Sequence, residues 1–350
     1  MHTRVVVYVA GLLVVVAVVG AVTWRVLGAR STYEQALDTL PGSTLRVAYI
    51  DWNVAREAAG GKPLTDTSPQ RRVAAFLGRA TTRDLVPGSA VAGSTQVLSR
   101  RYGFSALDAE WEALGTSASG SVDVLKLDGV DMAALEPRLR RLGYVAAGRV
   151  WTGSSALVTS LAGTSAPLLR HVVVLPDEHL VLLSDSAGYV SQAASVARGS
   201  GSSVLHGAGV GSLADAAGDP SAAVQWAGAY ACRDLAMSAA DPRAVQVGRA
   251  LVARAGGVSP LAGLVMAQHA DRSMVLAMRF SGSSEASRNL RPRVRLARGP
   301  APGQGGSFRD RFRVASSDAE GRDVVLQLQP VARRPVLSDL SSGPVLFAAC

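Results

Sequence analysis

The hydrophobic pattern divides the chain into an uncharged first segment and a longer region in which apolar positions recur at strand or helix spacing. Residues 5–24 carry no charge, and as a helix they would span about 30 Å, the thickness of a bilayer core. From residue 45 onward, short alternating segments predict strands, and segments with helical spacing separate them. The pattern predicts an α+β protein behind an N-terminal transmembrane helix, with mostly antiparallel sheets and flanking helices.

Turn residues and helix caps give approximate bounds to these elements. Strands are expected at 45–52, 121–127 and 148–153, in hairpins at 171–184 and 261–282, and at 221–232 and 323–330. Helices are expected at 54–59, 69–80, 94–105, 106–115, up to 143, and at 186–199, 209–218, 241–257 and 284–290.

An internal similarity suggests two related subdomains. The stretch "SVDVLKLDG" at 121–129 and the stretch "SMVLAMRFSG" at 273–282 are both strand-like, and a predicted helix follows each. The linker-like sequence between them favours a boundary near residue 165. We therefore expect an anchor at 1–31, a first α+β subdomain at 32–165 and a second at 166–350.

The uncharged segment Val5 to Trp24 is interpreted as a retained single-pass anchor in the membrane. Its length exceeds the usual apolar region of a cleaved signal peptide, and Trp24 and Arg25 resemble an interfacial anchor. A cleaved signal peptide remains the alternative. The arginines that flank the segment slightly favour a cytoplasmic C-terminal domain, whereas the signal-like position of the segment favours an extracytoplasmic one.

The chain has two cysteines, Cys232 and Cys350. Their number and the position of the second at the chain end suit a disulfide in an oxidising compartment. Two buried free thiols are the alternative. No histidine or further cysteine stands at metal-ligand spacing beside them, so no metal site is expected there.

Six arginines alternate with other residues in two stretches, and the alternation predicts a hairpin with one basic face. They are Arg291, Arg293, Arg295, Arg309, Arg311 and Arg313. Such a face suits an anionic lipid, wall polymer or phosphate. The apolar partners Val294 and Phe312 would produce the same alternation in an ordinary half-exposed hairpin. Nucleic acid is not expected as a partner, because neither exposed aromatic residues nor a recognition module accompany the arginines.

Motifs for catalysis and cofactors are incomplete. Gly207, Gly209 and Gly211 resemble a dinucleotide-binding fingerprint, but Ser212 stands where its third glycine should be. In the stretch 115–120, Ser119 replaces the second glycine of a nucleophile elbow. Asp108 and Glu112 would share one face of the helix expected at 106–115, where an exposed acidic face explains them. We therefore assign no catalytic, cofactor-binding or metal-binding residues and no cofactor.

Several stretches resemble a family of uncharacterised actinobacterial single-pass membrane proteins. They are "TLPGSTLRVAYIDW", "YGFSALDAEWE", "GPAPGQGGSF" and "LSDLSSGPVLFAAC", together with the anchor. The stretch "VVLPDEHLVLLSDS" and the following "GSLADAAG" more distantly resemble bacterial envelope-anchored domains of unknown function. The resemblance supplies no reaction, but it implies an extracytoplasmic location.

Together these observations predict a membrane-anchored extracytoplasmic protein, a non-catalytic module that binds a protein, lipid or wall polymer of the cell envelope. An envelope hydrolase with a dispersed active site is the alternative function. A pocket with a serine or aspartate beside a histidine would favour the hydrolase, and a shallow or apolar groove would favour binding. The sequence leaves the ligand and the oligomeric state open.

Overall fold

One twelve-stranded antiparallel sheet organises the unit Thr32–Cys350 in the computed structural model, which describes residues 30–235, 237, 240–331 and 334–350. This large sheet with flanking helices confirms the predicted α+β class. The predicted anchor Val5 to Trp24 lies outside the described residues. No helix in the described ranges is long and apolar enough to cross a membrane.

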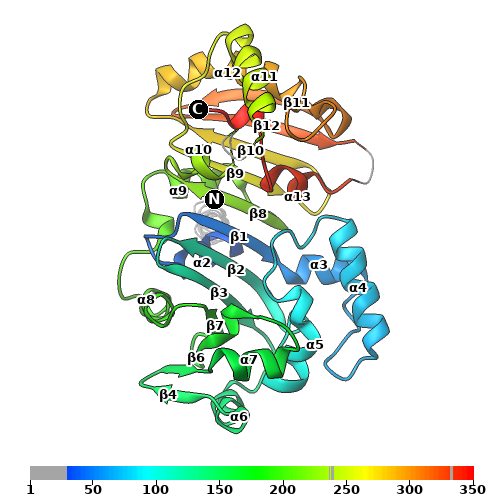
Figure 1. Cartoon of the computed structure of the whole chain (residues 1–350), viewed down its shortest axis with the longest axis vertical. Coiled ribbons are helices and arrows are strands. Elements are labelled where there is room, and N and C mark those ends of the chain that lie inside the picture. Colours follow the sequence, from blue (N-terminus) through cyan, green and yellow to red (C-terminus); the bar gives the residue numbers. More distant parts are fainter. Residues whose placement is uncertain (1–29, 236, 238–239, 332–333) are drawn as a thin grey trace, which may run out of the picture. The chain divides into compact units, whose positions relative to one another are not determined.

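The strands follow one another in the order β11-β12-β10-β9-β8-β1-β2-β3-β7-β6-β5-β4, from top to bottom in Figure 1. In chain order they are β1 (Arg46–Asp51), β2 (Ala109–Ser117), β3 (Gly120–Leu127), β4 (Val145–Ala147), β5 (Val150–Thr152), β6 (His171–Leu175), β7 (Leu180–Ser184), β8 (Ala222–Ala227), β9 (Gly263–Gln268), β10 (Met274–Arg279), β11 (Phe312–Glu320) and β12 (Asp323–Pro330).

The two ends of the sheet have the same strand order. Strands β1, β2 and β3 form a meander, and β7 of the β6–β7 hairpin then pairs with β3. Strands β8, β9 and β10 form a second meander, and β12 of the β11–β12 hairpin then pairs with β10. The first strands of the two meanders, β1 and β8, pair antiparallel in the middle of the sheet. The sheet is continuous across the boundary expected near residue 165.

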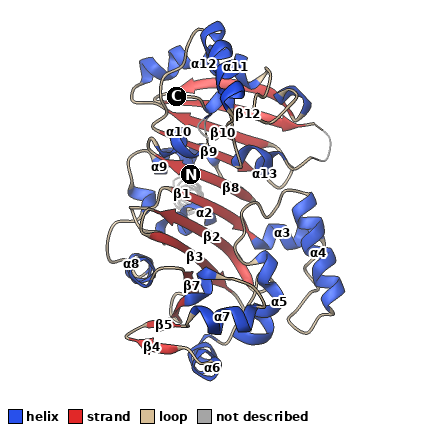
Figure 2. Cartoon of the chain, in the orientation of Figure 1, coloured by secondary structure: helices blue, strands red, loops and turns tan. Residues whose placement is uncertain are grey.

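Helices cover both faces of this sheet, as Figure 2 shows. They are α2 (Thr32–Asp38), α3 (Trp52–Ala59), α4 (Gln70–Thr82), α5 (Thr95–Val97), α6 (Leu135–Leu142), α7 (Ser155–Ala162), α8 (Ala187–Ala197), α9 (Val210–Ala217), α10 (Tyr230–Asp234), α11 (Pro242–Ala255), α12 (Ser283–Ala297) and α13 (Val336–Ser341). Apolar residues of α2, α8 and α9 form the core of one face. The opposite face carries two cores, one under α3 to α7 and one under α10 to α13.

A tether from the first half of the chain holds α13 on the sheet. Asp84 is 1% exposed, and its carboxylate accepts hydrogen bonds from the backbone amides of Leu337 and Ser338 at the start of α13. Its backbone has a φ of 61°, in the left-handed region that aspartate tolerates better than most residues. Its carbonyl oxygen also accepts a hydrogen bond from the Gln268 side chain in β9. One loop therefore connects two elements of the second half.

The helix predicted at 106–115 is wrong, because residues 109–117 form β2. Alanine, glutamate and leucine favour a helix locally, but the alternation of this stretch places Trp111 and Ala113 in one core and Glu112 on the other face. Glu112 is not on an exposed acidic face. It is 1% exposed and accepts hydrogen bonds from Trp52 Nε1 at 2.9 Å and from Ser89 Oγ at 2.8 Å.

The predicted disulfide between Cys232 and Cys350 is confirmed, although neither cysteine lies in a strand. The strand predicted at 221–232 ends at Ala227, and Cys232 lies in the short helix α10. The chain end is held beside α10 by a hydrogen bond of 2.9 Å from the Val345 amide to the Leu235 carbonyl. Short helical segments, rather than paired strands, therefore bring the two sulfur atoms together.

Candidate anion-binding site

Helix α12 positions three arginines on its outer surface. Its inner face packs on the sheet through residues three or four apart, among them Ala286, Arg293 and Leu296. Arg291, Arg295 and Arg298 follow one another at i, i+4 and i+7 along the side of the helix, where residues share one face. All three are exposed. The helical repeat therefore aligns three guanidinium groups beside the edge of the sheet.

These arginines line a hollow between α12 and β11 with a volume of about 400 Å³. Leu290 and Val294 of α12, Arg309 from the turn before β11 and Ser317 of β11 complete the lining. The hollow thus has four guanidinium groups, one hydroxyl and two apolar side chains, and no carboxylate among its lining residues. We refer to it below as the arginine pocket.

The register of β11 explains why the nearest acidic residues do not enter the arginine pocket. Ser317 stands opposite Leu326, and Leu326 belongs to the core under α12. Its neighbour Asp318 stands opposite Val325, which packs on the other face of the sheet. Because side chains alternate along a strand, Glu320 lies on the same side as Asp318. The acids of β11 therefore face away from the four arginines.

Two of the four arginines are held by backbone carbonyls, and two have no partner. Arg295 Nη1 donates to the Arg254 carbonyl at 3.0 Å, and Arg298 Nη2 donates to the Val314 carbonyl at 3.3 Å. Within the described ranges, the guanidinium groups of Arg291 and Arg309 have no hydrogen bond or ion pair. The pocket therefore combines two guanidinium groups that are held in place with two side chains that are free to turn toward a ligand.

The structure separates the six arginines that the sequence groups together. The expected hairpin is wrong at 291–296, which belongs to α12, and at 309–311, which forms a 3-10 turn and the residue after it. Only Arg313 of the six lies in a strand, and its register places it on the face opposite Ser317. The alternating pattern gave a wrong prediction because proline usually ends a helix, whereas α12 continues through Pro292, its tenth residue.

Arg293 and Arg311 point inward and cannot contact an external anion. Arg293 is 0% exposed and donates to the carbonyls of Phe347 at 2.7 Å and Ala349 at 2.6 Å, which fastens the chain end under α12. Burial lowers the pKa of its guanidinium. Arg311 donates to the Gln304 carbonyl at 3.0 Å. Sequence reasoning also missed Arg298, which the helical spacing from Arg291 would have identified.

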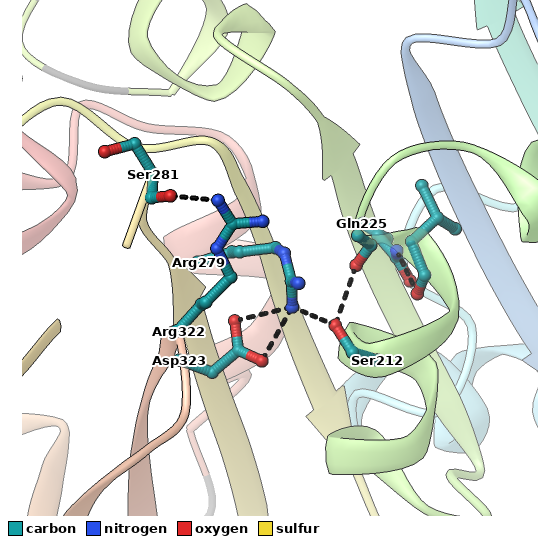
Figure 3. Close-up of polar contacts among 8 residues, drawn as sticks. Ser212, Gln225, Arg279, Ser281, Arg322 and Asp323 are labelled. Carbon is teal, nitrogen blue, oxygen red and sulfur yellow. Dashed lines mark hydrogen bonds and ion pairs between the residues drawn. The ribbon is translucent and has the colours of Figure 1, made fainter. Parts of the chain in front are cut away.

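A second arginine cluster lies at the junction of α9, β10 and β12, and its guanidinium groups have partners within the cluster (Figure 3). Arg279 Nη1 lies 2.9 Å from Asp323 Oδ2 and also contacts the hydroxyl of Ser212. Arg322 donates to the Ser281 carbonyl beside it. Gly209, with a φ of 83°, leaves room for this arrangement, because a Cβ atom there would lie 2.3 Å from Arg279 Cδ. Asp323 neutralises the charge of Arg279, whereas no carboxylate lines the arginine pocket.

Two other hollows have a different chemistry. An apolar groove of about 530 Å³ runs beside the disulfide and is lined by α11 residues such as Val245 and Val252 and by Leu346. A polar hollow of the same volume contains four aspartates together with Arg56 and Arg138. Over residues 30–235, 237, 240–331 and 334–350, no group of three or more histidine, cysteine, aspartate or glutamate residues is arranged to hold a metal ion.

A serine, a histidine and an aspartate meet outside these hollows. Ser203 Oγ lies 2.5 Å from Asp38 Oδ1 and 2.8 Å from His206 Nδ1. In a catalytic triad the histidine stands between the other two residues and uses both ring nitrogens. Here the serine stands between them, it is 3% exposed, and its two partners approach the same oxygen. This order suits a polar link between α2 and the loop before α9.

Comparisons with known proteins identify no family. No protein-family model matches the chain, and no curated protein matches its sequence. Among solved structures, crystal form III of a protein called TP0453 is 9% identical over 88% of this chain and 98% of that chain, with a TM-score of 0.40. Its crystal form I is 9% identical over 87% and 96%, with a TM-score of 0.39. A likeness at this level carries no argument about function.

Proposed function

We propose that this protein is a non-catalytic binding module of the cell envelope, and that it binds an anionic envelope component in the arginine pocket. The observation that carries the proposal is the lining: four exposed guanidinium groups, two of them without partners, in a hollow without a carboxylate. Like charges held this close repel one another, and an anion relieves that repulsion.

The proposed location is outside the cytoplasm, with Val5 to Trp24 as a retained single-pass membrane anchor. The disulfide supports an oxidising compartment, and the resemblance to single-pass actinobacterial membrane proteins agrees with it. A phosphatase fused after Cys350 should be active outside the cytoplasm, and carbonate-washed membranes should retain the full-length chain. Activity only of a cytoplasmic reporter, or a soluble product beginning near residues 22–31, would refute the proposed topology.

We propose in addition that the two halves of the chain are similar subdomains with a common origin. The support is the strand order, a three-stranded meander followed by a hairpin whose second strand pairs with the third strand of the meander. The division that this strand order supports lies between Ser184, where β7 ends, and Ala222, where β8 begins, and not near residue 165. The arginine pocket belongs to the second half alone.

The binding proposal is tested with purified full-length protein and a panel of anions that includes glycerol 3-phosphate, oligoglutamate and a polyuronate. At least one of them should bind to the wild type and bind at least tenfold more weakly to an Arg291→Ala/Arg309→Ala double variant. Arg313→Ala is the matched control, because it removes the same charge from the opposite face of β11. A panel in which nothing binds, or in which the double variant binds as well as the wild type, would refute this function.

The alternative envelope hydrolase rests on the cluster of Asp38, Ser203 and His206. If this cluster were a catalytic site, a fluorophosphonate probe would label Ser203, and His206→Ala would abolish the labelling. We expect no labelling, since the serine is buried and its hydroxyl donates to Asp38 rather than to a histidine base. Labelling at Ser203 would replace the binding proposal with a hydrolase.

A further inference from the structure

We infer that the arginine pocket selects a phosphomonoester, a dianionic phosphoryl group attached to a small organic body. This inference rests on the proposed function and narrows it from anions in general to one chemical class. Four aspects of the pocket support it: the directions of the donors, the charge of the lining, the volume and the apolar wall. The first two favour a phosphoryl group over a carboxylate, and the last two accommodate the organic body.

The donors reach the hollow from two sides. Arg291, Arg295 and Arg298 approach from the helix, and Arg309 and Ser317 approach from the turn and strand that face it. A carboxylate is planar and has two oxygens, which one or two guanidinium groups satisfy. A phosphoryl group presents three oxygens in a tetrahedral arrangement, so donors from opposite sides can each meet a different oxygen. The two-sided lining therefore fits phosphate geometry better than carboxylate geometry.

The charge of the lining also exceeds what a carboxylate neutralises. All four charged residues of the lining are arginines, and none of its other residues is charged. A phosphomonoester carries a charge of about −1.5 to −2 near neutral pH, because its second pKa is about 6. A carboxylate carries one negative charge. The dianion thus relieves more of the repulsion among the four guanidinium groups.

The remaining surface of the pocket accommodates the organic part of the ligand. A volume of about 400 Å³ is within the range of small-molecule sites and leaves space beyond a phosphoryl group. Leu290 and Val294 stand at i and i+4 on α12, so they form one apolar strip next to the arginines. Such a strip packs against carbon atoms next to the phosphate, as in the glycerol of a lipid headgroup or the sugar of a phosphorylated saccharide.

The test compares phosphate with carboxylate ligands on purified full-length protein by titration calorimetry. Glycerol 3-phosphate should bind at least tenfold more tightly than glycerate, which carries one carboxylate on the same three-carbon body. Its affinity should rise several-fold from pH 5 to pH 7, since the second proton leaves the phosphate in this window and no such change occurs for a carboxylate. Phosphatidylcholine vesicles with and without phosphatidic acid form a second arm. Binding to the phosphatidic acid vesicles identifies a lipid source, and binding to glycerol 3-phosphate alone identifies a soluble phosphoester.

Two variants attribute the binding to the arginine pocket. Arg291→Lys/Arg309→Lys keeps the charge but removes the planar fork of donors, so it should weaken phosphate binding by about three- to tenfold. Arg313→Lys is the control and should change nothing. If glycerate binds as tightly as glycerol 3-phosphate, the phosphate inference is wrong and the proposed function stands. If neither ligand nor any other anion binds, both are wrong.

Discussion

Asp123 is a buried carboxyl group whose removal should stabilise the protein. It lies in the middle of β3 with 0% exposure, between Leu114 of β2 and Leu183 of β7. Neither of its carboxyl oxygens has a hydrogen-bonding partner among the described residues. Burial, followed by the nearby charge of Glu112, raises the pKa of Asp123 well above its usual value of 3.8. We expect Asp123→Val to fill the same space in the strand without a polar group.

The expected gain in the free energy of unfolding has two parts. A buried carboxyl group without a partner costs about 1–3 kcal/mol even when it is protonated. Ionisation adds about 1.4 kcal/mol for each pH unit above the pKa of the unfolded chain, until the pH reaches the pKa of the folded state. The pKa of this acid is raised by folding, so the added cost is absent below pH 3.8 and grows as the pH rises. Asp123→Val should therefore raise the free energy of unfolding by about 3–5 kcal/mol at pH 5.

The assay is urea unfolding of the full-length protein, with the disulfide intact, followed by the fluorescence of its buried tryptophans. Asp123→Asn separates the two parts, because it keeps a buried polar group but cannot ionise. The free energy of unfolding of Asp123→Asn should equal that of the wild type near pH 4 and exceed it increasingly toward pH 6. Asp123→Val should be more stable than the wild type over the whole range. The reasoning is refuted if Asp123→Val destabilises the protein, or if the difference between Asp123→Asn and wild type does not change with pH.

Three further predictions concern the contacts that hold the chain end and α13. Replacing Cys232 and Cys350 with serine should lower the free energy of unfolding by up to about 5 kcal/mol, because the bridge spans 118 residues; alkylation without reduction should find no free thiol in the wild type. Asp84→Ala should cost about 2–4 kcal/mol in urea unfolding, with Asp84→Asn much milder, since alanine neither accepts the hydrogen bonds of α13 nor tolerates a φ of 61°. Arg293→Lys should cost about 1–3 kcal/mol and speed proteolysis of the chain end, since lysine has one nitrogen for the three carbonyls that Nη1 and Nη2 of Arg293 meet together; an unchanged cleavage rate would contradict this role.

Most strands were predictable because their residues alternate or form apolar runs between clear turns. The hairpin of β6 and β7 is an example, since both strands are wholly buried and Pro176 and Asp177 mark the turn between them. Helix α11 was equally clear, with Asp241 as its cap and Gly256 at its end. In these elements, local propensity, hydrophobic pattern and tertiary packing agree.

The sequence failed where packing overrode local preference. Residues 109–117 have helix-forming side chains, yet as β2 they pair with β1 and β3 in the interior of the sheet. Sheet pairing is a long-range effect that a local pattern does not contain. The order of the twelve strands was likewise beyond reach, because β1 pairs with β8 across about half of the chain.

The candidate site was half predictable for a related reason. Arg291, Arg295 and Arg309 were singled out by their basic character, which the structure retains at the surface. Which arginines share a face depends on the assumed secondary structure. The two-residue repeat of a strand grouped them with the buried Arg293, whereas the helical repeat groups them with Arg298. A continuous helix through Pro292 changes the partners of every arginine in the stretch. The composition therefore indicated the chemistry, whereas the secondary structure decided which side chains share a site.

The shared strand order of the two halves indicates why an arginine pocket forms at only one end of the sheet. Strand β11 is the last strand at its end, and the corresponding strand of the first half is β6. Strand β6 is not the last, since β5 pairs with it and β4 follows. The β4–β5 hairpin thus covers the outer edge of β6. At the other end of the sheet, no strand of the described residues pairs with the outer edge of β11, beside α12. If the halves arose by duplication, a ligand site at this edge could persist only in the second half, where α12 and Arg309 stand on either side of it.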